Sequence, residues 1–303
     1  IELGLKAGMG DKNQLSTQLN FKGFLGENGL LGSFSNSLID ISNSRIELNS
    51  NHSINYFDNS LRLMNFGLKQ NKGSITLNGD ISDKPNNKLD VVFKNLDISA
   101  FNPVLQYFGL NIKGEINERV VLRNILTGLT LTSNLVINNL YFNNISLGNA
   151  TFNINNSLSQ DIFATTIKMQ YKNSNNKTIL PLYIKGFINP KSKTDNLDLT
   201  LSTDELNLKL IENYFSSFSS SIGGTLYTKN LKIKGPFTQP NIDGELEIKN
   251  AHLKIDMLNT TYNFSDKIYL NNNTFSFKNF TLADNQKNKI ILNGNLNHKN
   301  FSE

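Results

Sequence analysis

The sequence predicts an all-β protein, built as one long, continuous, curved antiparallel sheet with one or two short helices. Three observations predict this fold class. Apolar and polar residues alternate with a period of two along nearly all of the 303 residues, which is typical of strands with one buried and one wet face. Glycines recur inside these alternating stretches, and only two segments have a helical pattern.

The alternation is clearest where large aliphatic or aromatic side chains occupy every second position. Asn, Asp, Lys, Ser and Thr fill most of the positions between them. Parallel sheets that are buried on both faces do not show this pattern, so an antiparallel arrangement is favoured. Representative rows are Leu89/Val91/Phe93, Leu182/Ile184/Ile188 and Leu197/Leu199/Leu201.

Five glycines stand where the apolar row of a strand should continue: Gly79, Gly114, Gly186, Gly244 and Gly294. In a strand, glycine marks a sharp bend, a bulge or a close approach to the backbone. The Asn-Gly pairs at Gly79 and Gly294 could alternatively form hairpin turns. Gly114 and Gly186 follow lysine instead, which favours a position inside strands. We expect these five glycines to bend the apolar face or to leave room for a guest against the backbone.

Two short segments have helical character. The first, Ser99 to Gly109, has Asn102 as a possible N-cap and Pro103 at the first helical position. The second runs from Leu208 to Phe218. Neither is long enough to cover a large sheet.

The glycines and helices suggest an internal repeat. Gly79, Gly186 and Gly294 are spaced by 107 and 108 residues, and Leu96 and Ile98 find counterparts 110 residues later. We predict one continuous groove-forming chain, 1–303, with modules of about 108 residues. The approximate boundaries are 1–59, 60–165, 166–273 and 274–303. Chance agreement between alternating patterns is the alternative explanation.

Composition narrows the class of protein. The net charge of +5 is spread along the chain, so no nucleic-acid partner is predicted. The chain has no cysteine, and therefore neither a disulfide framework nor a thiolate nucleophile. No apolar run approaches the roughly 18 residues of a membrane helix. The chain starts at Ile1 in the middle of the alternation, and we expect it to be a fragment of a longer protein.

Catalytic and metal-binding patterns are weak. His52, His252 and His298 are isolated, without the spacing of metal ligands. Acidic pairs such as Asp204-Glu205 lie in alternating strand context and are explained as solvated carboxylates. No catalytic residue, metal site or cofactor is predicted, and an enzyme is the least favoured class.

The apolar face must be covered. About thirty to forty large apolar side chains, each forgoing roughly 1.5–3 kcal/mol if left in water, would cost more than a domain's typical net stability of about 5–15 kcal/mol. Either a second sheet covers this face, or the sheet curls around a channel that holds a hydrophobic guest. Alternation continues through the module junctions without a linker, which favours one continuous sheet.

The residues from about 60 to the end carry a recognisable pattern of glycine, proline and alternation. It comprises Ile75–Gly79, Leu89–Phe93, Leu96–Ile98, Leu231–Pro236, Pro240, Gly244–Ala251, Tyr262–Phe264, Ile268, Phe275, Phe277, Leu282–Asp284, Leu292–His298 and Phe301. This pattern resembles the TamB family, the inner-membrane-anchored subunit of the translocation and assembly module, within the AsmA-like superfamily of bridge-like lipid transport proteins.

The resemblance implies a periplasmic protein of a Gram-negative envelope that spans between the inner and outer membranes. It implies a U-shaped sheet, or β-taco, whose apolar groove conducts phospholipid, and a possible role in outer-membrane protein assembly. The implied partners are phospholipid in the groove, an outer-membrane barrel of the TamA type, and the inner membrane through an N-terminal anchor, which we expect to be missing from this fragment.

On this interpretation, alternating apolar side chains line the groove. The expected lining residues are Ile75, Leu77, Ile81, Leu89, Val91, Phe93, Ile112, Ile116, Leu182, Ile184, Ile188, Leu197, Leu199, Leu201, Ile242, Leu246 and Ile248. Two alternatives stay open: an assembly module that pairs client strands with exposed sheet edges, and an adhesin of tandem β-sandwiches.

Overall fold

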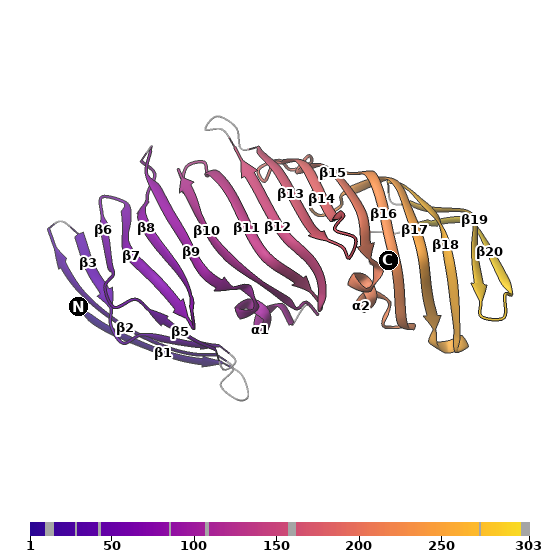
Figure 1. The fold of residues 1–303 in the computed structure, drawn as a ribbon. Helices are drawn as coiled ribbons and strands as arrows, with labels where there is room; N and C mark the ends of the chain where they lie inside the picture. The colour runs from indigo at the N-terminus through magenta and orange to yellow at the C-terminus, as the bar shows by residue number, and fades with distance from the viewer. Residues whose placement is uncertain are drawn as a thin grey trace. The chain divides into compact units, whose positions relative to one another are not determined.

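The computed structural model describes residues 1–9, 15–27, 29–41, 44–84, 86–106, 109–156, 162–272 and 274–297. Twenty strands within these ranges form one antiparallel sheet (Figure 1). The predicted all-β class, with a long continuous antiparallel sheet and short helices, is confirmed. A second packed sheet, which tandem sandwiches would require, is absent from the described part of the chain.

The chain forms two compact units, residues 1–138 with 153–161 and residues 139–152 with 162–303. The module boundaries predicted from the repeat stay predictions. The strands of the first unit are β1 (Glu2–Met9), β2 (Leu15–Gly26), β3 (Gly29–Phe34), β4 (Leu38–Ile41), β5 (Ser44–Leu48), β6 (Ser53–Phe57), β7 (Ser60–Gln70), β8 (Gly73–Ile81), β9 (Lys88–Asp97) and β10 (Ile112–Arg123). β11 (Thr130–Phe142) and β12 (Ile145–Asn155) contribute residues to both units.

In the first unit, consecutive strands pair from β6 to β10. Near the N-terminus the sheet is interrupted, because two successive positions are each occupied by two short strands, β3 with β4 and β5 with β6. β2 therefore pairs with β3 through its C-terminal half and with β4 through its N-terminal half. β3 then pairs with β6 and β4 with β5. His52 lies at this interruption, where its Nε2 accepts the Phe34 backbone N–H at 2.8 Å and its Nδ1 contacts the Asn49 carbonyl. The buried ring therefore satisfies backbone groups that the sheet leaves unpaired.

The second unit is an uninterrupted meander. Each strand from β13 to β20 pairs antiparallel with the next. The strands are β13 (Phe163–Lys172), β14 (Thr178–Ile188), β15 (Leu197–Asn207), β16 (Ser219–Gly235), β17 (Asn241–Ile255), β18 (Thr260–Asn271), β19 (Thr274–Asp284) and β20 (Lys289–Asn297). A 3₁₀ turn, η4 (Asp256–Leu258), joins β17 to β18.

All five glycines of the predicted pattern lie inside strands. Gly79 is in β8 and Gly294 in β20, so the hairpin-turn alternative for the two Asn-Gly pairs is wrong. The φ angles of the five lie between 131° and 154°, a backbone conformation that favours glycine over residues with a Cβ. His298 and Phe301, which belong to the sequence pattern, lie outside the described residues.

An asparagine bulge recurs within the strands. Asn65, Asn95, Asn139, Asn250 and Asn279 have φ between 44° and 53°, and each lies in a sequence of the form apolar-x-Asn-apolar. At Asn65, two residues of β7 oppose the single residue Asn78 of β8, which is the definition of a β-bulge. The extra residue keeps the apolar residues before and after it on the same face.

The residue opposite each bulge accepts a hydrogen bond through its side chain. The bulged backbone N–H donates to a side-chain oxygen on the neighbouring strand: Asn78 at 2.6 Å, Asn117 at 2.6 Å, Asn149 at 3.0 Å, Ser265 at 2.8 Å and Asn293 at 2.7 Å. Asparagine tolerates the left-handed conformation better than most residues. Nine asparagines of the sequence therefore have a structural task in these bulges, five as the bulged residue and four as its partner. Because bulges bend a strand and increase its twist, the sheet is bent at a set place in each of these strand pairs.

Replacing Asn95 tests the bulge. Asn95→Ala is expected to lower the free energy of unfolding by about 1 kcal/mol, because alanine is strained in the left-handed region. Asn95→Gly keeps both the φ angle of 44° and the N–H that bonds Asn117, so its effect should be smaller. Urea unfolding followed by circular dichroism measures both variants. An equal loss in both would contradict the assignment of Asn95 to a strain-limited bulge.

The helical segments are partly 3₁₀, and the second ends earlier than predicted, whereas residues 107–108 of the first lie outside the described residues. They are η1 (Ile98–Phe101) with α1 (Asn102–Leu105), and η3 (Leu208–Ile211) with α2 (Glu212–Phe215). The N-cap assignment to Asn102 is wrong, because Asp97 caps the first segment by accepting the Ser99 N–H at 2.9 Å. The Asn102 side chain instead bonds both backbone groups of Ile112, each at 2.8 Å. Within the described ranges, no helix has the length and hydrophobicity needed to cross a membrane.

Candidate functional site

The candidate site is the apolar face of the sheet, whose residues are identified by strand register. In the first unit, Leu77 of β8 lies opposite Val91 of β9, and Ile75 lies opposite Phe93. Directly opposed residues in an antiparallel pair share a face. Register and alternation place all eight lining residues predicted for this unit on that face: Ile75, Leu77, Ile81, Leu89, Val91, Phe93, Ile112 and Ile116.

The second unit carries an equivalent row across five strands. Ile184 of β14 lies opposite Ile167 of β13 and Leu201 of β15, and Leu201 lies opposite Leu231 of β16. Register and alternation put the remaining predicted lining residues on the same face: Leu182, Ile184, Ile188, Leu197, Leu199, Leu201, Ile242, Leu246 and Ile248.

This face is only partly covered by the chain. Leu89, Ile116 and Ile248 are buried, with exposed fractions of 5%, 7% and 7%. The other predicted lining residues are all half-buried. An apolar side chain that keeps part of its surface in water forgoes up to about 1 kcal/mol of the stabilisation that full burial gives. The described chain therefore leaves an apolar surface that a hydrophobic guest would stabilise.

The glycines of the apolar rows lie against neighbouring backbone. A Cβ on Gly79 would stand 2.0 Å from the Lys88 carbonyl oxygen, and one on Gly186 would stand 2.0 Å from that of Asp198. For Gly114 and Gly244 the contacts start at 2.7 Å and 3.0 Å, whereas Gly294 meets nothing within 4 Å. At four of the five positions, the adjacent strand or its side chains occupy the space that a side chain would need.

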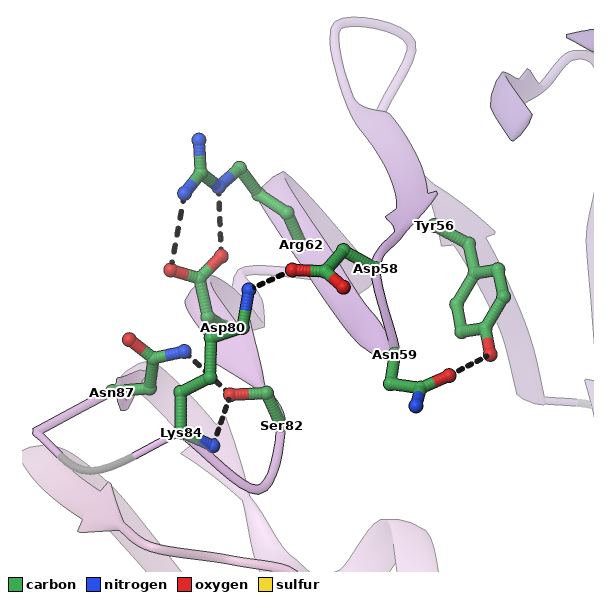
Figure 2. Close-up of polar contacts among 8 residues, drawn as sticks. All are labelled: Tyr56, Asp58, Asn59, Arg62, Asp80, Ser82, Lys84 and Asn87. Atoms are coloured by element: carbon green, nitrogen blue, oxygen red, sulfur yellow. Dashed lines mark hydrogen bonds and ion pairs between the residues drawn. The ribbon is translucent and has the colours of Figure 1, made fainter. Parts of the chain in front are cut away.

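The opposite face of the first unit is polar and carries cross-strand ion pairs. Arg62 of β7 holds Asp80 of β8 through two contacts, Nε–Oδ1 at 2.7 Å and Nη2–Oδ2 at 3.2 Å (Figure 2). Arg119 Nη2 lies 2.7 Å from Asp90 Oδ1. Burial raises the pKa of Asp90, but Arg119 and Lys88 outweigh this effect and leave the pKa below its ordinary value.

The second unit has the same division between its faces. Lys234 Nζ lies 3.2 Å from Asp198, and Lys267 Nζ lies 2.7 Å from Glu245. These residues alternate with the apolar row, so they lie on the other face of β15 to β18. Exposed pairs of this kind contribute little stability, but they keep that face wetted and the two faces chemically distinct.

One carboxylate on the apolar face was missed by sequence reasoning. Glu118 lies directly opposite Phe93 and two positions from Ile116, so it belongs to the apolar row of β10. Its spacing of two residues from Ile116 is the sequence signal that would have assigned it to the same face. Leu208 and Phe215 of the second helical segment were also missed as residues of this face, because a strand pattern does not reveal where a short helix docks.

Polar clusters offer little catalytic chemistry. His252 Nε2 lies 3.3 Å from Ser221 Oγ, while Asp256, the carboxylate nearest in sequence, accepts a hydrogen bond from Ser220 instead. His298 lies outside the described residues. Across the described ranges, no group of three or more His, Asp or Glu side chains could hold a metal ion.

Comparisons with known proteins identify the family. The chain matches the family described as TamB, N-terminal domain, over residues 9–248. No curated protein and no solved structure matches the chain. The family match covers most of the strands whose apolar residues form the face described above.

Proposed function

The chain belongs to the TamB family, and on that premise we propose that the apolar face of its sheet carries phospholipid acyl chains between the inner and outer membranes of a Gram-negative envelope. Members of the family serve as non-enzymatic components of a module that spans the periplasm. For this chain we propose in addition that phospholipid is the cargo and that the predicted lining residues hold it. Acyl chains would lie against the predicted lining residues, with their polar head groups toward water.

The observation that carries the proposal is the incomplete burial of the apolar rows. Fourteen of the seventeen predicted lining residues are half-buried, although they are large aliphatic or aromatic side chains that share one face within each unit. A face of this kind provides contact area but few fixed hydrogen-bond donors. Such contacts are non-directional, which suits a surface that binds lipid and also releases it along its length.

The bends support the same function. In β7 to β10 and in β17 to β20, asparagine bulges interrupt the ladder while keeping apolar residues on one face. A sheet bent in this way can curve around a guest of acyl-chain width. Assistance to outer-membrane protein assembly, with a barrel partner of the TamA type, would accompany this transport as the family's second role.

Lipid analysis tests the proposal. The chain is purified from a Gram-negative host without detergent, extracted with organic solvent and examined by mass spectrometry. Phospholipid should be recovered in a fixed ratio to protein, and a variant with Leu199→Asp and Leu246→Asp should retain much less. If the folded wild type carries no more lipid than an unrelated β-protein purified alongside it, the proposal fails.

A further inference from the structure

The second helical segment occupies part of the apolar face. Leu208 of η3 is 5% exposed and forms a buried cluster with Ile222, Ile248 and Ala251. Phe215 of α2 packs against that cluster, and α2 lies beside one end of β16 (Figure 1). Two residues of a short helical segment therefore stand where an acyl chain would lie on β16 and β17.

Most of the other residues of this segment are exposed. Tyr214 is 80% exposed and Ile211 is 37% exposed. In the last turn the Ser216 N–H donates to the Asn213 carbonyl and the Phe218 N–H to the Phe215 carbonyl, both within the segment. The Phe218 carbonyl, next to the start of β16, accepts the Asp256 N–H at 3.1 Å and marks the end that stays attached. Helical pieces of this length are not stable by themselves, so contacts of Leu208 and Phe215 with the sheet hold the segment in place.

The corresponding segment of the first unit is attached differently. The Asn102 side chain accepts the Ile112 N–H and donates to the Ile112 carbonyl, both at 2.8 Å. These two bonds fasten α1 to the start of β10. The residue 110 positions later is Glu212, whose backbone N–H donates to the Lys209 carbonyl but whose side chain makes no hydrogen bond or ion pair with the described residues. Ile222 takes the place of Ile112. Position 212 of the second segment thus lacks the polar latch, by which we mean the two bonds that the Asn102 side chain makes with Ile112 in the first.

We infer that residues 208–218 form a displaceable lid over an acyl-chain site lined by Ile222, Leu226, Ile248, Ala251, Leu253 and Phe264, whereas the first helical segment is fixed. This inference rests on the proposed function. The lid and a guest compete for the same apolar surface, so the apparent affinity for a guest is reduced by the fraction of closed lid. Because Glu212 makes no latch, the fraction of closed lid stays low enough for guests to enter and leave the site.

Adding the latch to the second segment, and shortening the side chain that packs on the sheet, both test the lid. The probe is anthroyloxy-stearate, a fluorescent fatty acid, titrated into the whole chain. Glu212→Asn supplies the side chain that bonds Ile112 in the first unit, and two added hydrogen bonds should weaken probe binding about tenfold. Phe215→Ala removes the ring with which the lid packs on the sheet and should strengthen probe binding severalfold. Glu212→Gln, which is neutral but too long to copy the latch, controls for the lost charge.

Hydrogen exchange gives a second readout that does not depend on probe affinity. Adding the probe should speed amide exchange in residues 208–218 of the wild type and much less in Glu212→Asn. Asn102→Ala should make residues 98–105 exchange faster even without the probe. Unchanged probe affinity in both Glu212→Asn and Phe215→Ala, with exchange of 208–218 indifferent to the probe, would overturn the lid.

The outcomes separate the lid from the proposed function. If the Leu199→Asp, Leu246→Asp variant loses probe binding but Glu212→Asn and Phe215→Ala do not change it, the proposed lipid face is supported and the lid is rejected. Failure of the wild type to bind the probe at all counts against both. Weaker binding in Glu212→Asn, with unchanged binding in Glu212→Gln, supports the lid specifically.

Discussion

Gly186→Ala is expected to destabilise the second unit by about 3 kcal/mol or more, because strain and steric overlap combine at this position. The φ of 146° is one that residues with a Cβ rarely adopt. The new Cβ would also stand 2.0 Å from the Asp198 carbonyl oxygen and 2.9 Å from the Leu199 Cα. Backbone atoms cannot rotate away as a flexible side chain does, so β14 and β15 must separate. The free energy of urea unfolding measures the loss.

Gly294→Ala is the matched control for this prediction. Its φ of 143° is almost the same, but nothing lies within 4 Å of an added Cβ. It retains the backbone strain and lacks the collision, so its cost should be about 1–2 kcal/mol. Similar losses at the two positions would mean that conformation alone explains the glycines, and that the close approach of β15 has no energetic role.

The variant with Leu199→Asp and Leu246→Asp is expected to lose at least about tenfold in lipid affinity, because a carboxylate against an acyl chain must give up its hydration. Both side chains are half-buried and lie on one face of β15 and β17. Their carboxylates can stay wet in the empty sheet, so the strands should persist. Circular dichroism reports the strand content, and transfer of fluorescent phospholipid between vesicles reports the function.

The control adds the same two charges to the other face. Thr200 and Ser202 alternate with Leu199 and Leu201 in β15, and they lie opposite Lys185 and Tyr183 on the polar face. Thr200→Asp with Ser202→Asp should leave lipid transfer near the wild-type rate. Equal inhibition by the two pairs would point to charge or stability rather than to the apolar face.

The sheet and the composition of its faces could be predicted from sequence because both depend on local spacing. A period of two assigns Ile184 and Lys185 to opposite faces without knowledge of the neighbouring strand. The same argument placed Gly79 inside β8, although Asn-Gly is otherwise a strong turn signal. The family match over residues 9–248 agrees with the resemblance drawn from these strands.

The bulges and the helix attachments could not be predicted because they depend on partners distant in sequence. Asn65 is recognisable as a bulge only when Asn78 is known to oppose it. Asn102 precedes a proline, as an N-cap often does, yet its side chain is used by Ile112 instead. Bulges also shift the alternation, so period-two counting loses track of the face in the middle of a strand.

The central claim is that lipid lies on one face of this sheet and not on the other. A photoreactive amino acid placed at Leu199 and, separately, at its neighbour Thr200 tests it in living Gram-negative cells, with mass spectrometry to identify the crosslinked adducts. Phospholipid adducts are predicted at position 199, with only background labelling at position 200. Equal labelling at the two positions, or none at 199 in a folded protein, would contradict the claim.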